Sequence, residues 1–235
     1  MAEAELAEGP GAARCAGSSP VVPICFVGDL HGRLDVLQKI IKESDRRGEY
    51  HYVLMGDLLH HKRYFKRSKP TPSIQMLSCV HHLEQSGRAT VIMGNNEGYI
   101  LESINRPVKD IKSHSVRQTV SQLNSLRGAE RKLMLTWMRN MRKYMEIQRD
   151  GVIYRVAHAY YPNQRFSTDS YILSGPGYPW FKKDSLLEHL DPSYQYILGH
   201  YGYPYLRDNL KIIDSTLFEG VGTFYTDRNE FMVYY

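Results

Sequence analysis

Side chains that can bind metal ions follow a series of apolar segments along this chain, each where a strand is expected to end. The segments are, in order, Gly28-Asp29-Leu30-His31-Gly32, Gly56-Asp57, Gly94-Asn95-Asn96-Glu97, His158, Gly199-His200 and Asp214. Carboxylates, imidazoles and amide oxygens in this order suit two divalent cations that share one carboxylate. Any one Gly-Asp or Gly-His is more often an ordinary turn. The first five of these segments, from Asp29 to His200, carry ligands in a fixed order, and together they favour a metal site.

Strand and helix patterns alternate in the first hundred residues. Apolar runs at residues 21–27, 50–55 and 89–93 predict buried strands, and residues 33–47 and 72–86 show the apolar spacing of helices that end at a glycine. This alternation indicates an α/β fold with a parallel sheet. Loops at the carboxyl ends of neighbouring parallel strands meet at one edge, so we expect the candidate ligands to converge there.

The second half of the chain has a different pattern. Residues 108–143 are mostly helical in pattern, broken near Gly128, and are expected to form an insertion. Asp150-Gly151 predicts a tight hairpin turn between residues 144–149 and 152–157. Further strands are expected at residues 194–198, 210–214, 222–226 and 230–235, with loops at 175–180 and 201–205. A parallel half followed by an antiparallel half indicates two sheets packed face to face with helices outside.

Size and composition set broad limits. With 235 residues, 42% of them apolar, the chain can form one sizeable domain, which we expect at residues 21–235 after a disordered tail at residues 1–20. That tail resembles neither a signal peptide nor a transit peptide, and no apolar run is long enough to cross a bilayer. The three cysteines are odd in number and widely spaced, which favours reduced thiols and a cytoplasmic location. A net charge of +5 suits an anionic substrate, although solubility explains it equally well.

The donor types also indicate the metal. Imidazole favours the later divalent ions over Mg, so we expect two divalent ions, Mn first, with Fe or Zn as alternatives. Asp57 is the expected bridging ligand, because one carboxylate has two oxygens. Two such cations are expected to hold a hydroxide between them and to clamp a phosphoryl group for in-line attack.

From about Ile24 to its C-terminus, the chain resembles the calcineurin-like metallophosphoesterases, in particular the small members related to lambda-type Ser/Thr protein phosphatase and bacterial diadenosine tetraphosphatase. The resemblance rests on the segments GDLHGR, MGDLL, MGNNE, VAHAYYP, ILGHYGYP and IIDSTLFEGVGTF. It implies a four-layer sandwich of two central β-sheets flanked by helices. It also implies two metal sites, the first formed by Asp29, His31 and Asp57, and the second by Asp57, Asn95, His158 and His200.

Two motifs depart from the family pattern. The family's GDxxDRG reads GDLLHHK here, and its GNHE reads GNNE. Where the family has the Asp that orients the general acid, this chain has His60. It has His61 in place of the Arg that binds phosphate, and Asn96 in place of the general-acid His. An amide does not titrate, so Asn96 cannot supply a proton, although it can donate a hydrogen bond to a phosphoryl oxygen.

Two interpretations of this change remain open. In one, His60 takes over the acid role and Asn96 orients it, because histidine titrates near neutrality. In the other, no acid exists and the enzyme favours good leaving groups, as in nucleotide diesters or anhydrides. It is almost equally consistent with the sequence that His60 and His61 are loop residues without a role.

Several further side chains are candidates for substrate binding. The candidate phosphate ligands are His61, Arg33, Arg63 and Arg165, although such residues more often lie on the surface. Arg63 belongs to a cation-rich loop with two aromatics that could grip phosphate or stack a base. Tyrosines 160, 161, 201, 203 and 205 cluster beside His158 and His200, where a nucleobase pocket and simple packing are equally consistent with the sequence.

The sequence as a whole predicts a metal-dependent phosphoric ester hydrolase that acts on a phosphate ester or a nucleotide phosphodiester or anhydride. The expected partner is a phosphorylated small molecule or nucleotide, with a phosphoprotein as alternative, and neither a membrane nor a stable nucleic-acid partner is expected. A Ser/Thr phosphoprotein phosphatase and a non-catalytic metal-binding scaffold on the same fold are the alternative functions.

Overall fold

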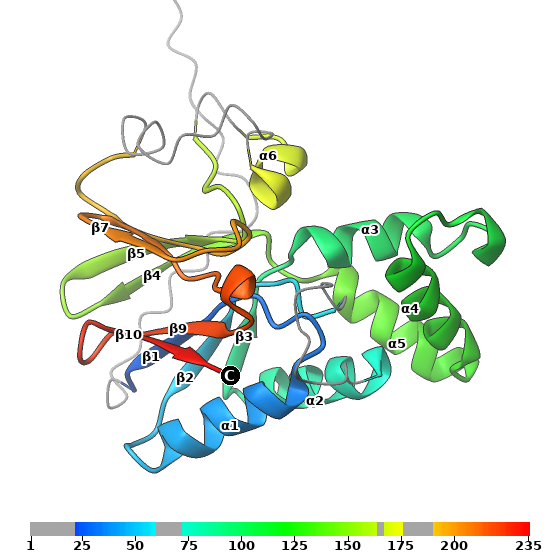
Figure 1. Cartoon of the computed structure of the whole chain (residues 1–235), viewed down its shortest axis with the longest axis horizontal. Coiled ribbons are helices and arrows are strands. Elements are labelled where there is room, and N and C mark those ends of the chain that lie inside the picture. Colours follow the sequence, from blue (N-terminus) through cyan, green and yellow to red (C-terminus); the bar gives the residue numbers. More distant parts are fainter. Residues whose placement is uncertain (1–21, 60–71, 164–166, 176–189) are drawn as a thin grey trace, which may run out of the picture.

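The structure is a computed structural model that describes residues 22–59, 72–163, 167–175 and 190–235. Within these ranges two five-stranded β-sheets lie face to face, flanked by helices (Figure 1). This arrangement confirms the predicted α/β sandwich of two central sheets with helices outside. The expected tail at residues 1–20 lies outside the described residues, so its disorder stays a prediction.

The first sheet combines both ends of the chain. Its strand order is β10-β9-β1-β2-β3. The strands are β1 (Ile24–Val27), β2 (His51–Leu54), β3 (Ala89–Val91), β9 (Val221–Tyr225) and β10 (Glu230–Tyr234). β1, β2 and β3 are parallel as expected, but β9 pairs antiparallel with β1. Every residue of β1 is buried, as is typical of a central strand that needs a partner on each side.

The second sheet contains the remaining strands in the order β4-β5-β6-β8-β7. They are β4 (Tyr144–Arg149), β5 (Val152–Ala157), β6 (Gln195–Leu198), β7 (Tyr205–Arg207) and β8 (Leu210–Ile212). The β4–β5 hairpin has the predicted bounds, and Asp150 and Gly151 have positive φ angles of 48° and 78°. The expected antiparallel second half is confirmed for the pairs β4–β5, β7–β8 and β9–β10, but it is wrong for β5, β6 and β8, which are parallel. The reason is that the long connections between these strands return the chain to the same end of the sheet.

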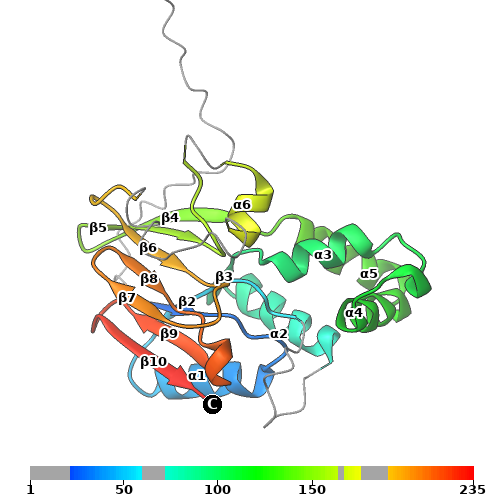
Figure 2. The same ribbon diagram turned by 45° about the horizontal axis from the view of Figure 1, so that its top comes forward.

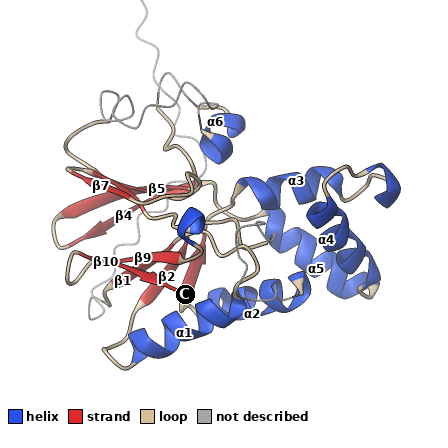
Figure 3. Cartoon of the chain, viewed as in Figure 1, coloured by secondary structure: helices blue, strands red, loops and turns tan. Residues whose placement is uncertain are grey.

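Helices lie along the outer face of the first sheet, form a group at one side and, as one short helix, lie near one end of the second sheet (Figures 1 and 3). They are α1 (Leu34–Asp45), α2 (Ser73–Gln85), α3 (Asn95–Ser103), η1 (Val108–Asp110), α4 (His114–Ser125), α5 (Gly128–Arg139), α6 (Asp169–Ser174) and η2 (Thr216–Phe218). The expected helical insertion corresponds to η1, α4 and α5, and Gly128 begins α5. The sequence did not predict α3, which starts within the third metal-ligand motif. Among the described helices, none combines the length and the apolar content needed to cross a membrane.

The two sheets lie one over the other (Figure 2). An apolar layer to which both contribute joins them. Phe26, Val53 and Ile92 enter it from the first sheet and its edge, and Val156 and Ile197 enter it from the second. Because strands alternate their side chains, Cys25 and Val27 of β1 instead pack in the layer that contains residues of α1 and α2. The sheet packing therefore fixes where the carboxyl ends of β1, β2, β5 and β6 meet.

Phe26 tests this layer. Its ring centroid lies 5.7 Å from that of Tyr154 and 6.5 Å from that of Phe224. Phe26→Ala should lower the free energy of unfolding by about 3–5 kcal/mol, because a fully buried ring leaves a cavity. Leu133→Ala on α5 is the control, since Leu133 is 56% exposed and should change stability by less than about 0.5 kcal/mol. Urea unfolding followed by circular dichroism measures both, and equal effects would contradict the assignment of Phe26 to the core.

Candidate metal centre

Backbone hydrogen bonds join the loops that follow β1 and β2. The amides of Leu30 and His31 donate to the carbonyl of Asp57 at 3.2 and 2.8 Å, and the amide of Gly32 donates to Leu58 O at 2.7 Å. The first two ligand motifs are thus held as one unit at the carboxyl edge of the parallel strands, where the sequence places the site.

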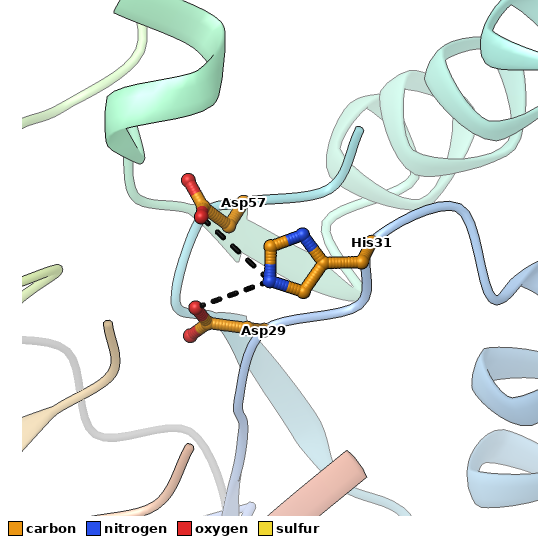
Figure 4. Close-up of side chains that lie close together, drawn as sticks. All are labelled: Asp29, His31 and Asp57. Carbon is orange, nitrogen blue, oxygen red and sulfur yellow. Dashed lines mark ion pairs between the residues drawn. The ribbon is translucent and has the colours of Figure 1, made fainter. Parts of the chain in front are cut away.

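Asp29, His31 and Asp57 form a buried cluster within this unit (Figure 4). Their exposed fractions are 0%, 0% and 2%, and one ligand atom from each lies within 4.8 Å of the others. His31 Nε2 is 3.7 Å from Asp29 Oδ2 and 3.8 Å from Asp57 Oδ2. Two buried carboxylates repel each other, so a cation among them would stabilise the cluster.

The other candidate ligands contact one another, and His158 among them faces the second carboxylate oxygen of Asp57. His158 Nε2 lies 3.4 Å from Asp57 Oδ1 and 3.1 Å from Asn95 Oδ1. His200 Nδ1 lies 2.9 Å from the same Asn95 oxygen, and the amide of His200 donates to Asp29 Oδ1 at 3.1 Å. The structure therefore brings all six predicted ligands together, with Asp57 between the two groups.

The orientation of His158 bears directly on metal binding. Its Nδ1 lies 2.7 Å from the carbonyl oxygen of Met55, which can only accept, so Nδ1 carries a hydrogen. In the neutral ring, the lone pair of Nε2 then faces the oxygens of Asp57 and Asn95. Three electron-rich atoms converge in this way, and a cation among them would satisfy all three. Burial opposes protonation of the ring, but the nearby charges of Asp57 and Asp29 offset it and raise the pKa of His158.

Three of the six residues have strained backbones. His31, Asp57 and His200 have φ angles of 45°, 48° and 69°, in the left-handed region that residues other than glycine seldom adopt. Such strain costs about 1–3 kcal/mol per residue and gathers at functional sites. Gly56, with φ 87°, also lies in the left-handed region that favours glycine. A side chain would not fit there, because a Cβ would lie 2.4 Å from Gly94 N.

A model of the family described as calcineurin-like phosphoesterase matches residues 22–217. The chain belongs to the calcineurin-like phosphoesterase family. Three solved structures share the fold over most of their length. A candidate diadenosine tetraphosphatase is 14% identical, with 90% of this chain and 92% of that chain covered and a TM-score of 0.62. No curated protein matches the chain.

The other two similar structures come from named organisms. Hypothetical protein PH1004 from Pyrococcus horikoshii OT3 is 13% identical, with 91% of this chain and 87% of that chain covered and a TM-score of 0.60. A metallophosphoesterase from Sphaerobacter thermophilus is 15% identical over the same shares, with a TM-score of 0.58. The chain therefore has the metallophosphoesterase fold. Asp29, His31 and Asp57 form a candidate metal site within it.

Asn96, for which the resemblance implies the family's general-acid position, makes contacts within the candidate site. Its Nδ2 donates to Leu59 O at 3.1 Å and lies 3.3 Å from His31 Nδ1, and its backbone amide donates to Asp57 Oδ1 at 3.0 Å. The side chain thus links the second motif to His31. A hydrogen bond from Asn96 to a phosphoryl oxygen would have to replace one of these contacts.

Glu97 has a structural role that the sequence analysis missed. Its buried carboxylate accepts the amides of Asp57 at 2.9 Å, Gly94 at 3.0 Å and Leu59 at 3.3 Å. Burial and then the charge of Asp57 raise the pKa of Glu97 to about 7. The available signal was its position three residues after Gly94, which caps α3 in a capping-box pattern.

The remaining predicted residues lie elsewhere or outside the described ranges. Arg33 is buried, donates to Glu219 O at 3.2 Å and pairs with Asp35 at 3.5 Å. The carboxylate of Asp214 accepts the amides of Gly202 and, at 2.9 Å, Thr216. Four predicted site residues fall outside the described residues, namely His60, His61, Arg63 and Arg165.

Glu97→Gln tests the support beneath Asp57. Glutamine has one acceptor oxygen for amides that now share two, so at least one buried N–H loses its partner. We expect the free energy of unfolding to fall by about 1–3 kcal/mol. Urea unfolding in excess chelator measures this without any contribution from metal. The matched control is Glu102→Gln, an exposed position on the same helix that should change nothing, and equal stability of both variants would contradict this role.

Proposed function

We propose that this chain hydrolyses phosphate esters with two divalent cations held by six side chains, of which Asp29, His31, Asp57 and His158 are buried and Asn95 and His200 are partly exposed. The observation that carries the proposal is the position of Asp57, whose Oδ2 faces His31 at 3.8 Å and whose Oδ1 faces His158 at 3.4 Å. A carboxylate between two ligand groups suits a dinuclear site with one shared ligand. Asp29, His31 and Asp57 would hold one ion, and Asp57, Asn95, His158 and His200 the other.

The donor set supports a particular choice of metal. Three imidazoles accompany two carboxylates and one amide oxygen, which favours Mn, Fe or Zn over Mg, and we place Mn first. When bound, such a pair of ions activates water and neutralises charge on a phosphoryl group. The protein buries Asp29, His31, Asp57 and His158. It directs the His158 lone pair through Met55 O and holds the Asp57 backbone through Glu97.

Asp57→Asn tests the shared ligand. We expect the purified protein to retain less than its full complement of two ions and to lose hydrolysis of aryl phosphate esters by at least about 10²-fold. Elemental analysis and initial rates provide two separate readouts. Asp110→Asn, at an exposed carboxylate of η1, is the control and should keep both the metal content and the hydrolysis rate. Full metal content and rate in Asp57→Asn would refute the proposed site.

The proposed substrate is a nucleotide diester, anhydride or other phosphorylated small molecule rather than a phosphoprotein. Asn96 cannot protonate a leaving group, so substrates whose leaving groups depart unprotonated suit this site best. The structural similarity to a candidate diadenosine tetraphosphatase is consistent with this choice. A non-catalytic scaffold is disfavoured, because the buried carboxylates remain together although they repel each other without a metal.

Asn96→His tests the absence of a general acid. On alkyl monoesters, which have poor leaving groups, we expect a gain of about 10-fold or more, within the range that general acids provide, and little gain on p-nitrophenyl esters. Asn96→Ala separates this gain from the loss of contacts with Leu59 and His31. No gain for histidine over alanine would contradict the account. In parallel, an altered pH profile in His60→Ala would favour His60 as the acid.

We also place the protein in the cytoplasm. Cys25 and Cys79 are both free, and burial raises the pKa of the Cys25 thiol to about 12, so this thiol is protonated and unreactive. Free, protected thiols suit a reducing compartment.

A further inference from the structure

The segment after β8 inverts the usual distribution of side chains. Ser215 and Thr216 are buried at 1% and 0% exposure, whereas the next two residues, Leu217 and Phe218, are 49% and 57% exposed. Large apolar side chains are usually buried and hydroxyl groups usually exposed, because exposing an apolar surface or burying a polar group costs free energy. The arrangement in this segment is the reverse. Tyr203, on the loop after His200, is 42% exposed. We refer to Tyr203, Leu217 and Phe218 as the apolar rim.

Hydrogen bonds hold the backbone of the rim in place. Asp214 accepts the amides of Gly202 and Thr216, and the amide of Leu217 donates to Gly202 O at 2.7 Å. Leu217 also packs on Gly202, where an added Cβ would lie 2.9 Å from Leu217 Cγ. The exposed apolar side chains therefore project from a rigid support, which lowers the entropy cost of binding a ligand.

The rim is tied to both sides of the metal centre. Gly202 follows His200 by two residues, and Arg33, two residues after His31, donates to Glu219 O at 3.2 Å. η2, the short orange-red helix in Figure 1, thus lies between the loops that carry these two candidate ligands. The rim is therefore joined by hydrogen bonds to the loops that carry His200 and His31.

We propose that the apolar rim is a subsite for the base of a nucleotide substrate, with Phe218 as its stacking surface. This inference rests on the proposed function and specifies its substrate class. A few exposed side chains match the size of a single flat ring, whereas a specific protein interface buries about 800 Å² on each partner. Stacking on an aromatic side chain tolerates any base, because each base has a π-face.

Product-side ligands test the subsite without relying on turnover. Titration calorimetry of the Mn-loaded full chain should show that adenosine 5′-monophosphate binds at least about 5-fold more tightly than ribose 5-phosphate, as expected from one stacked base. Phe218→Ala should bring this ratio close to one and leave the affinity for inorganic phosphate unchanged. Phe218→Tyr keeps the ring and should preserve the ratio. Leu133→Ala removes an equally exposed apolar side chain on α5 and should also preserve it.

A fluorescence experiment provides a second readout. In Phe218→Trp, the new indole should be quenched by adenosine 5′-monophosphate and not by ribose 5-phosphate, because only the nucleotide can stack on it. Equal binding of the two ligands by the unaltered protein, or a ratio that survives Phe218→Ala, would overturn the subsite. A phosphoserine peptide whose binding depends on Phe218 while the nucleotide's does not would also overturn it.

The outcomes separate this subsite from the proposed catalytic activity. Phe218-dependent nucleotide binding without hydrolysis of any ester would support the subsite and refute the catalytic proposal. Asp57-dependent hydrolysis without any preference for the nucleotide would support the catalytic proposal and refute the subsite.

Discussion

The arrangement of this protein depends on the burial of one carboxylate, that of Asp57, between two groups of ligands. At 2% exposure it faces His31 through one oxygen and His158 through the other, and it also accepts the amide of Asn96. A buried charge is tolerated only where partners surround it. Much of the surrounding structure can be understood as the means of keeping those partners in position.

The partners of Asp57 are held in position by hydrogen bonds to backbone groups. Glu97 accepts the Asp57 and Gly94 amides, and the Asp57 carbonyl in turn accepts the His31 amide. The left-handed conformations of His31, Asp57 and His200 are kept because loops joined in this way have few alternatives. The apolar layer between the sheets adds the long-range constraint, since it sets β1 and β2 against β5 and β6.

The changes from the family motifs and the apolar rim lead toward the same kind of substrate. The amide of Asn96 contacts Leu59 O and His31 Nδ1 at the position where the family resemblance implies a titrating group, and the proposed consequence is a preference for ligands with good leaving groups. The rim beside His200 offers an apolar surface for the organic part of such a ligand. Under these two proposals, the expected substrate is an anhydride or diester of a nucleotide rather than a phosphoserine on a protein surface.

The sequence by itself determined the local elements and the identity of the candidate ligands, because both depend on residues close together in the chain. Asp150-Gly151 specified a hairpin through its turn conformation, and Gly56 and Gly94 marked the strand ends that carry Asp57 and Asn95. Only the tertiary structure decided which strands share a sheet, since β9 pairs with β1 through contacts almost 200 residues apart. It also decided the support by Glu97 and the outward display of Phe218, because burial and hydrogen-bond partners are set by segments distant in sequence.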